Sequence, residues 1–125
     1  MTPKKPRVAL SLGDVCGISP EVVALALHDP RVQAAMLPVV YGDLGALDDA
    51  LELRGLPLWN SPGGLASRGA ELIQVTRLTP TERRSGPPDE ARAHAAGHAA
   101  AAYLNAAIDA IEAKSADALC TAPLS

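Results

Sequence analysis

The residues best suited to bind a ligand lie near the amino terminus, in the segment GDVCGISPE at residues 13–21. An apolar run at residues 7–12 precedes this segment, and it is typical of a parallel strand that is covered on both faces. Gly13 and Gly17 allow a positive φ or a close approach of the backbone to a ligand, and Asp14 supplies a carboxylate between them. The sequence therefore predicts a buried strand followed by a ligand loop.

A helix is predicted to begin directly after this loop. Ser19 suits the N-cap position, and Pro20 suits the first helical position, where its missing N–H is of no consequence. The free N–H groups at such a helix start face the carboxyl edge of the strand, where open α/β sheets bind anionic ligands. The segment has neither the Lys-Ser/Thr pair of a Walker loop nor the spacing Gly-x-Gly-x-x-Gly. A tight turn that binds nothing is therefore the alternative interpretation.

A second candidate residue lies at the other end of the chain. A strand is predicted at residues 117–120, and it leads into the turn TAP at residues 121–123. Thr121 then places a hydroxyl at the carboxyl edge of the sheet, beside the first loop if the two strands are neighbours. The alternative is that Thr121 only braces the turn before the proline.

The three histidines do not match a metal-binding motif. His94 and His98 are four residues apart on a predicted helix, but the glutamate of the motif His-Glu-x-x-His is absent between them. A solvated pair is therefore predicted. His28 closes the first predicted helix, where a solvated side chain is also expected. The sequence assigns no metal ligand.

The elements that must position these residues alternate between strands and helices. The patterns predict strands near residues 7–12, 37–41, 71–76 and 117–120, a further short strand candidate at 56–59, and helices near 20–28, 43–53 and 89–113. Asp43 is a candidate N-cap, and residues 77–88 read as an exposed loop with a solvated Arg83-Arg84 pair. On the long helix, Tyr103 is predicted to lie on the apolar face together with Leu104, Ile108 and Ile111. The alternation predicts a three-layer α/β fold with a largely parallel sheet.

Composition limits the function classes. The chain has 125 residues, of which 48% are hydrophobic, so it is one domain's worth of globular protein. Eleven basic residues against fourteen acidic ones, with only three aromatic residues, argue against a nucleic-acid partner. No apolar segment is long enough for a membrane span and no signal-peptide core follows the start, so a cytoplasmic protein is expected. Cys16 and Cys120 are expected to be free thiols.

The segment at residues 13–21 resembles the motif Gly-Asp-Pro-Ala-Gly-Ile-Gly-Pro-Glu of the 4-hydroxythreonine-4-phosphate dehydrogenase family of pyridoxal phosphate biosynthesis. It is more distantly similar to the Gly-Asp-Gly-Ile-Gly-Pro-Glu of isopropylmalate and isocitrate dehydrogenases. The chain departs from the closer motif at Val15, Cys16 and Ser19. The TAP segment is also similar to one in the family, and the two motifs occur in the family's order. The resemblance implies that residues 1–125 are the amino-terminal α/β portion of a longer dehydrogenase fold.

That resemblance also implies a function. The family carries out NAD-dependent, divalent-metal-assisted oxidation, with decarboxylation, of a phosphorylated hydroxy-amino acid, and its members are homodimers. Gly13, Asp14 and Gly17 then belong to the cofactor side of the site and Thr121 to the substrate side. The family's metal-binding histidines lie beyond its TAP motif, so neither metal nor catalytic residues can be placed, and the chain is expected to be a truncated or partial form.

Two other functions stay open. One is a non-catalytic binding or assembly module, or a relic of the fold, that uses the alanine-rich helix at residues 89–114 as its contact surface. The other is a dehydrogenase of a related four-carbon phosphorylated hydroxy acid, because the residues that choose the substrate lie mostly outside the chain.

Overall fold

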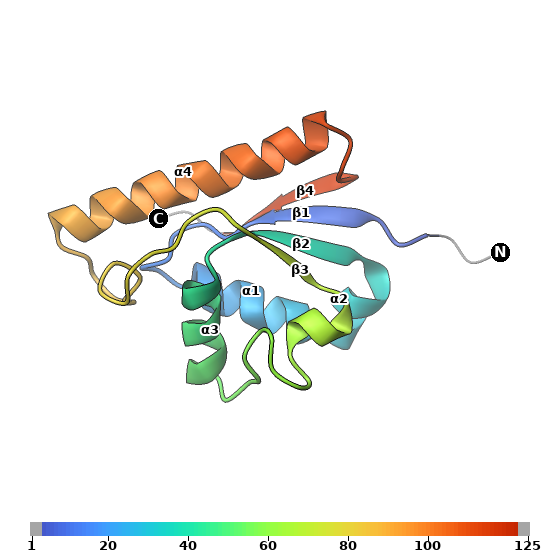
Figure 1. Cartoon of the computed structure of the whole chain (residues 1–125), viewed down its shortest axis with the longest axis horizontal. Coiled ribbons are helices and arrows are strands. Elements are labelled where there is room, and N and C mark those ends of the chain that lie inside the picture. Colours follow the sequence, from blue (N-terminus) through green and yellow to red (C-terminus); the bar gives the residue numbers. More distant parts are fainter. Residues whose placement is uncertain (1–3, 123–125) are drawn as a thin grey trace.

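A parallel sheet lies between two layers of helices in the computed structural model, which describes residues 4–122 (Figure 1). The strands are β1 (Arg7–Ser11), β2 (Leu37–Gly42), β3 (Glu71–Gln74) and β4 (Ala118–Thr121), in the order β3-β2-β1-β4. The helices are α1 (Ser19–His28), α2 (Pro30–Ala35), α3 (Leu44–Leu53) and α4 (Glu90–Glu112), with a 3-10 turn at Leu65–Arg68. All neighbouring strands are parallel. The predicted three-layer α/β class is confirmed.

The two faces of the sheet are covered differently. Figure 1 shows α4 alone on one face and α1, α2 and α3 on the other. Large aliphatic side chains fill the layer with α1 and α3, including Leu27, Leu47 and Leu51, which are at most 2% exposed. In the α4 layer, Ala9 of β1 packs with Ala107 of α4 and other alanines. Small side chains therefore let α4 lie close to the sheet.

The contact face of α4 differs from the predicted one. Tyr103 is fully buried as expected, but Ile108 is 37% exposed. The buried residues of the helix are instead mostly alanines, namely Ala96, Ala99, Ala107 and Ala110, together with Arg92 and Tyr103. Because the sheet is close to the helix axis, alanine fits the contact and the larger Ile108 lies at its border.

Three local predictions were wrong. Ser19 is the first residue of α1 and is buried, while the N-cap position is held by Ile18 without a side-chain hydrogen bond. Residues 56–59 form no strand, and Trp59 is buried, with its backbone N–H donating to Asp48 Oδ1 at 2.9 Å. His28 is only partly exposed, and its Nε2 is buried without a hydrogen-bond partner among residues 4–122.

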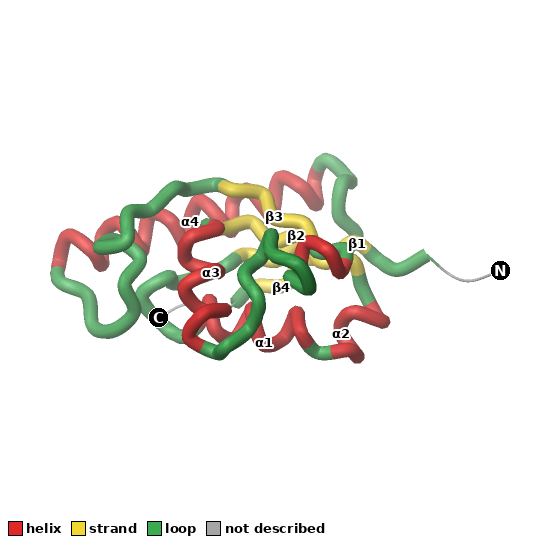
Figure 2. Tube along the Cα trace, turned by 60° about the horizontal axis from the view of Figure 1, so that its bottom comes forward, coloured by secondary structure: helices red, strands yellow, loops and turns green. Residues whose placement is uncertain are grey.

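The two edges of the sheet are formed by β3 and β4, as Figure 2 shows from a second direction. The prediction that the strand at residues 71–76 lies near an edge is thus confirmed. All four residues of β4 are exposed. The predicted turn at residues 121–123 extends past the described residues. Within residues 4–122, every helix is too short or too polar to cross a membrane.

Candidate functional site

The carboxyl ends of β1 and β4 are neighbours. Ser11 and Thr121 are register partners, and the N–H of Ala122 donates to the carbonyl oxygen of Ser11 at 3.1 Å. Thr121 is exposed, whereas Ser11 is only 1% exposed. The sequence predicted this neighbourhood only on the condition that the two strands pair, and the sheet order meets that condition.

The loop after β1 is shaped by its own aspartate. Gly13 has a φ of 80°, in the left-handed region that favours glycine. Asp14 Oδ1 accepts the N–H of Cys16 at 2.9 Å, and the N–H of Gly17 donates to the Asp14 carbonyl oxygen at 3.2 Å. A Cβ placed on Gly17 would lie 3.5 Å from Asp14 Oδ2, which is an ordinary contact. Asp14 therefore stabilises the turn, a role that the sequence had left open beside ligand binding.

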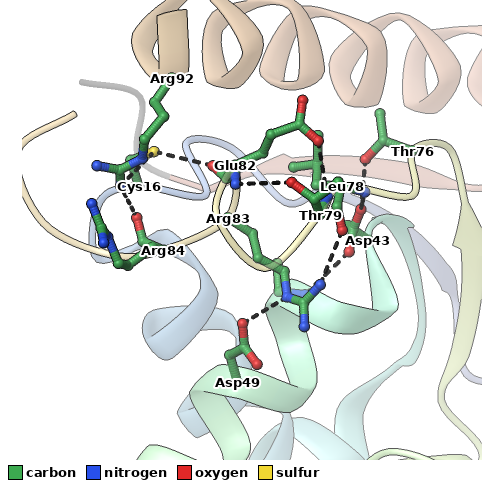
Figure 3. Close-up of polar contacts among 11 residues, drawn as sticks. Cys16, Asp43, Asp49, Thr76, Leu78, Thr79, Glu82, Arg83, Arg84 and Arg92 are labelled. Atoms are coloured by element: carbon green, nitrogen blue, oxygen red, sulfur yellow. Dashed lines mark hydrogen bonds and ion pairs between the residues drawn. The ribbon is translucent and has the colours of Figure 1, made fainter. Parts of the chain in front are cut away.

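Cys16 joins this loop to the rest of the fold. Its carbonyl oxygen accepts the N–H of Gly86 at 3.0 Å, and its Sγ lies 3.7 Å from the Glu82 carbonyl oxygen. Arg92 on α4 contacts the same Sγ at 3.9 Å and also donates to the Arg84 carbonyl oxygen (Figure 3). Burial raises the pKa of the Cys16 thiol, and Asp14 raises it further. Cys16 is thus a free, protonated structural thiol, in line with the prediction.

The segment at residues 77–88 is an ordered loop fastened to α3. Arg83 Nε donates to Asp49 Oδ2 at 2.7 Å, and its Nη1 donates to the Leu78 carbonyl oxygen at 3.0 Å (Figure 3). The guanidinium lies over Gly45, where an added Cβ would come within 2.8 Å of Arg83 Cζ. The prediction of a solvated Arg83 was therefore wrong. Residues 49 and 83 are 34 apart, so no local sequence signal could have paired them.

Asp43, after β2, is the N-cap that the sequence predicted and also organises a buried network. Its Oδ1 accepts the N–H of Ala46 at 3.1 Å, while Oδ2 accepts the Thr76 hydroxyl at 2.9 Å and the Leu78 N–H at 2.7 Å. Thr76 Oγ1 in turn lies 2.5 Å from the hydroxyl of Tyr103 on α4. Burial raises the pKa of Tyr103 to about 12. The Asp43 carboxylate therefore has a structural role.

A cavity of about 250 Å³ opens between the start of α1, α3 and the loop at residues 77–88. Gly17 and Arg84 line this cavity, together with the charged residues Glu21, Asp49 and Arg83. Glu21 is paired with Arg54 at 2.8 Å, and Asp49 with Arg83 at 2.7 Å. The volume is below the roughly 300–1,000 Å³ of sites that enclose a whole small ligand. This cavity can therefore hold only part of a dinucleotide cofactor.

A divalent metal needs several donor side chains gathered at one place. Residues 4–122 contain no group of three or more histidine, cysteine, aspartate or glutamate side chains that could hold one. This part of the chain therefore does not fit a complete catalytic metal centre.

The chain is similar to the amino-terminal part of known dehydrogenases. The 4-hydroxythreonine-4-phosphate dehydrogenase of Trichlorobacter lovleyi is 32% identical over 100% of this chain and 38% of its own length. The D-threonate 4-phosphate dehydrogenase of Cupriavidus necator is 32% identical over 95% of the chain and 36% of its own. No protein-family model matches.

Solved structures show the same relation. A crystal structure of a 4-hydroxythreonine-4-phosphate dehydrogenase from Burkholderia phymatum superposes with a TM-score of 0.79 at 27% identity. The match covers 98% of this chain and 38% of that protein. A putative 4-hydroxythreonine-4-phosphate dehydrogenase from Salmonella typhimurium gives a TM-score of 0.71 at 26% identity. In sequence and in fold, the chain is similar to the amino-terminal part of 4-hydroxythreonine-4-phosphate dehydrogenases, and it spans between a third and two fifths of the length of these relatives.

Proposed function

We propose that this chain forms one wall of the ligand cleft of an NAD-dependent dehydrogenase that oxidises a four-carbon phosphorylated hydroxy acid. The observation that carries the proposal is that the Asp14 loop and Thr121 lie at the carboxyl ends of neighbouring parallel strands. This edge is where open α/β sheets bind their ligands. The whole chain is, in addition, related to dehydrogenases of such substrates.

The roles proposed for the residues follow from their positions. Thr121 offers an exposed hydroxyl to the substrate. The left-handed turn at Gly13 places backbone without a side chain near this edge, which suits a cofactor. Asp14 holds this loop in shape through the Cys16 N–H. NAD, when bound, would accept a hydride from the carbinol carbon of the substrate.

The family resemblance supports the remaining parts of the proposal. They are a homodimer, a cytoplasmic location, a divalent metal held by residues outside this chain, decarboxylation of the oxidised product, and a place in pyridoxal phosphate biosynthesis. The substrate is either 4-hydroxythreonine-4-phosphate or D-threonate 4-phosphate, because relatives of both activities are 32% identical to the chain.

Calorimetric titration tests the proposal directly. The purified chain is titrated with NAD and with each phosphorylated acid, and NADH formation is then followed with Mn²⁺ present. We expect one of the acids to bind, and Thr121→Val to weaken its binding by about tenfold through loss of one hydrogen bond. The control is Ser115→Ala, which removes a hydroxyl that precedes β4 and therefore lies near its amino-terminal end, away from the proposed site.

The two measurements separate the alternatives. If neither acid nor NAD binds at millimolar concentration, the proposed cleft wall is contradicted. Binding without NADH formation contradicts only intrinsic turnover by this chain, and it favours the non-catalytic binding module that the sequence left open.

A further inference from the structure

Two histidines lie side by side on the outer surface of α4. His94 and His98 are both exposed, and their ring centres are 4.5 Å apart. The spacing of four residues puts them on one face of the helix, one turn apart. They belong neither to the carboxyl-edge site nor to the buried network around Asp43.

The separation of the rings suits a shared metal ion. Imidazole nitrogens bind such ions at about 2.1 Å. Two rings at the right angle of a tetragonal Cu²⁺ or Ni²⁺ ion therefore have centres about 4.5 Å apart. The two ring planes are now inclined at 72°. Exposed side chains rotate within nanoseconds, so both rings can turn a nitrogen toward a common point without any movement of the backbone.

The surroundings leave room for an ion above the pair. Ala93, Gly97 and Ala101 line a shallow hollow together with the two histidines. A Cβ added to Gly97 would meet no atom within 4 Å, so this side of the helix is open. The helix itself is fixed from below by its buried alanines and Tyr103. The two imidazoles are thus carried by a rigid element, which is what a preorganised site requires.

We propose that His94 and His98 form a two-imidazole binding site for a borderline divalent cation, namely Cu²⁺, Ni²⁺ or Zn²⁺. Imidazole is a favoured ligand of these ions, whereas Mg²⁺ and Ca²⁺ prefer oxygen. Residues 4–122 supply no third ligand to form a closed centre. Water or a donor from a bound molecule completes the coordination, so the site is an open surface chelate. It is independent of the proposed dehydrogenase function.

Titration with Ni²⁺ alone tests this site, with calorimetry as the readout. We expect one Ni²⁺ per chain, and a loss of roughly 100-fold in affinity for either His94→Ala or His98→Ala, because the second ligand acts at a high effective concentration. Alanine is the best helix former and both positions are exposed, so the variants keep their fold. Far-UV circular dichroism verifies this. His28 is present in every variant, so any Ni²⁺ that it binds contributes equally to all the titrations.

A spacing control separates chelation from the mere presence of two histidines. The double variant His98→Ala/Ala101→His keeps two exposed histidines on the helix but places them seven residues apart, about 10 Å along its axis. We expect it to bind Ni²⁺ as weakly as the single variants do. Equal affinity of the parent and either single variant, or tight binding by the respaced variant, would overturn the proposal.

Discussion

A glycine–aspartate pair lies at the carboxyl end of each of two neighbouring parallel strands, and the two carboxylates have different roles. Asp43, after β2, is 1% exposed and accepts hydrogen bonds from Ala46, Thr76 and Leu78. Asp14, after β1, is partly exposed and accepts the N–H of Cys16 within its own loop. The same dipeptide thus supports the core at one strand end and shapes a short accessible loop at the next.

This comparison shows how the fold separates stability from ligand binding. The network around Asp43 links α3, the loop at residues 77–88 and α4. The Asp14 loop therefore contributes less to the stability of the fold. We therefore expect changes around Asp43 to affect mainly stability, and changes around Asp14 to affect mainly binding.

The largest effect is expected for Asp43→Ala. The change removes an N-cap and leaves the partly buried N–H of Leu78 without its acceptor, so the free energy of unfolding should fall by about 3 kcal/mol or more. The matched variant Asp14→Ala should lose less, about 1 kcal/mol, since the hydrogen bond from the Cys16 N–H lies in a partly exposed turn. Urea unfolding of both variants measures this difference. Equal losses would refute the division of roles.

The second prediction concerns Tyr103, which joins the same network through Thr76. Its pKa is about 12 in the folded chain and about 10 when unfolded. The unfolded state therefore loses its proton first, and stability falls as the pH rises from about 10 to 12, by about 2–3 kcal/mol in all. Tyr103→Phe should remove this part of the alkaline slope. Tyr41→Phe, in β2, is the control for removal of a phenol hydroxyl outside this network.

A smaller effect is expected where Arg83 lies over Gly45. In the parent chain Gly45→Ala should be neutral or cost up to about 1 kcal/mol, because the new methyl group displaces the guanidinium. In an Arg83→Ala background the same change should instead stabilise α3, by up to about 1 kcal/mol, through helix propensity. A double-mutant cycle by thermal unfolding measures the change of sign. Its absence would show that the two residues are not coupled.

The smallest effect concerns His28, at the opposite end of α1 from the Asp14 loop. Burial lowers the pKa of its imidazole, and nearby Arg68 lowers it further. As the pH falls below about 6.5 the unfolded state takes up the proton first, so stability decreases in that range. His28→Gln should flatten this decrease, and His98→Gln is the control for replacement of a histidine at an exposed site. Chemical denaturation at a series of pH values would detect either result.

Local patterns were sufficient to predict most of the fold. The four main strands and three main helices lie within two residues of their predicted bounds, because the apolar runs and breakers that define them are local. Asp43 as a cap was likewise readable from its position before a helical pattern. The family motifs located Asp14 and Thr121, and the sheet order then brought their strands together.

The contacts that hold the site were not predictable in this way. The pairs Arg83–Asp49 and Arg92–Cys16 are separated by 34 and 76 residues, and periodicity carries no information about such partners. The contact face of α4 was missed for a different reason. Hydrophobicity favours Ile108, but the close approach of the helix to the sheet selects alanine.

The most direct test of the central claim is to map ligand binding by ¹⁵N chemical shifts. The labelled chain is titrated with 4-hydroxythreonine-4-phosphate, D-threonate 4-phosphate and NAD. We predict shifts concentrated at residues 13–18 and 118–122, reduced in Asp14→Asn and Thr121→Val while the signals of the Asp43 network stay in place. Shifts centred elsewhere on the chain, or none at millimolar ligand, would contradict the assignment of the carboxyl edge of β1 and β4 as the ligand site.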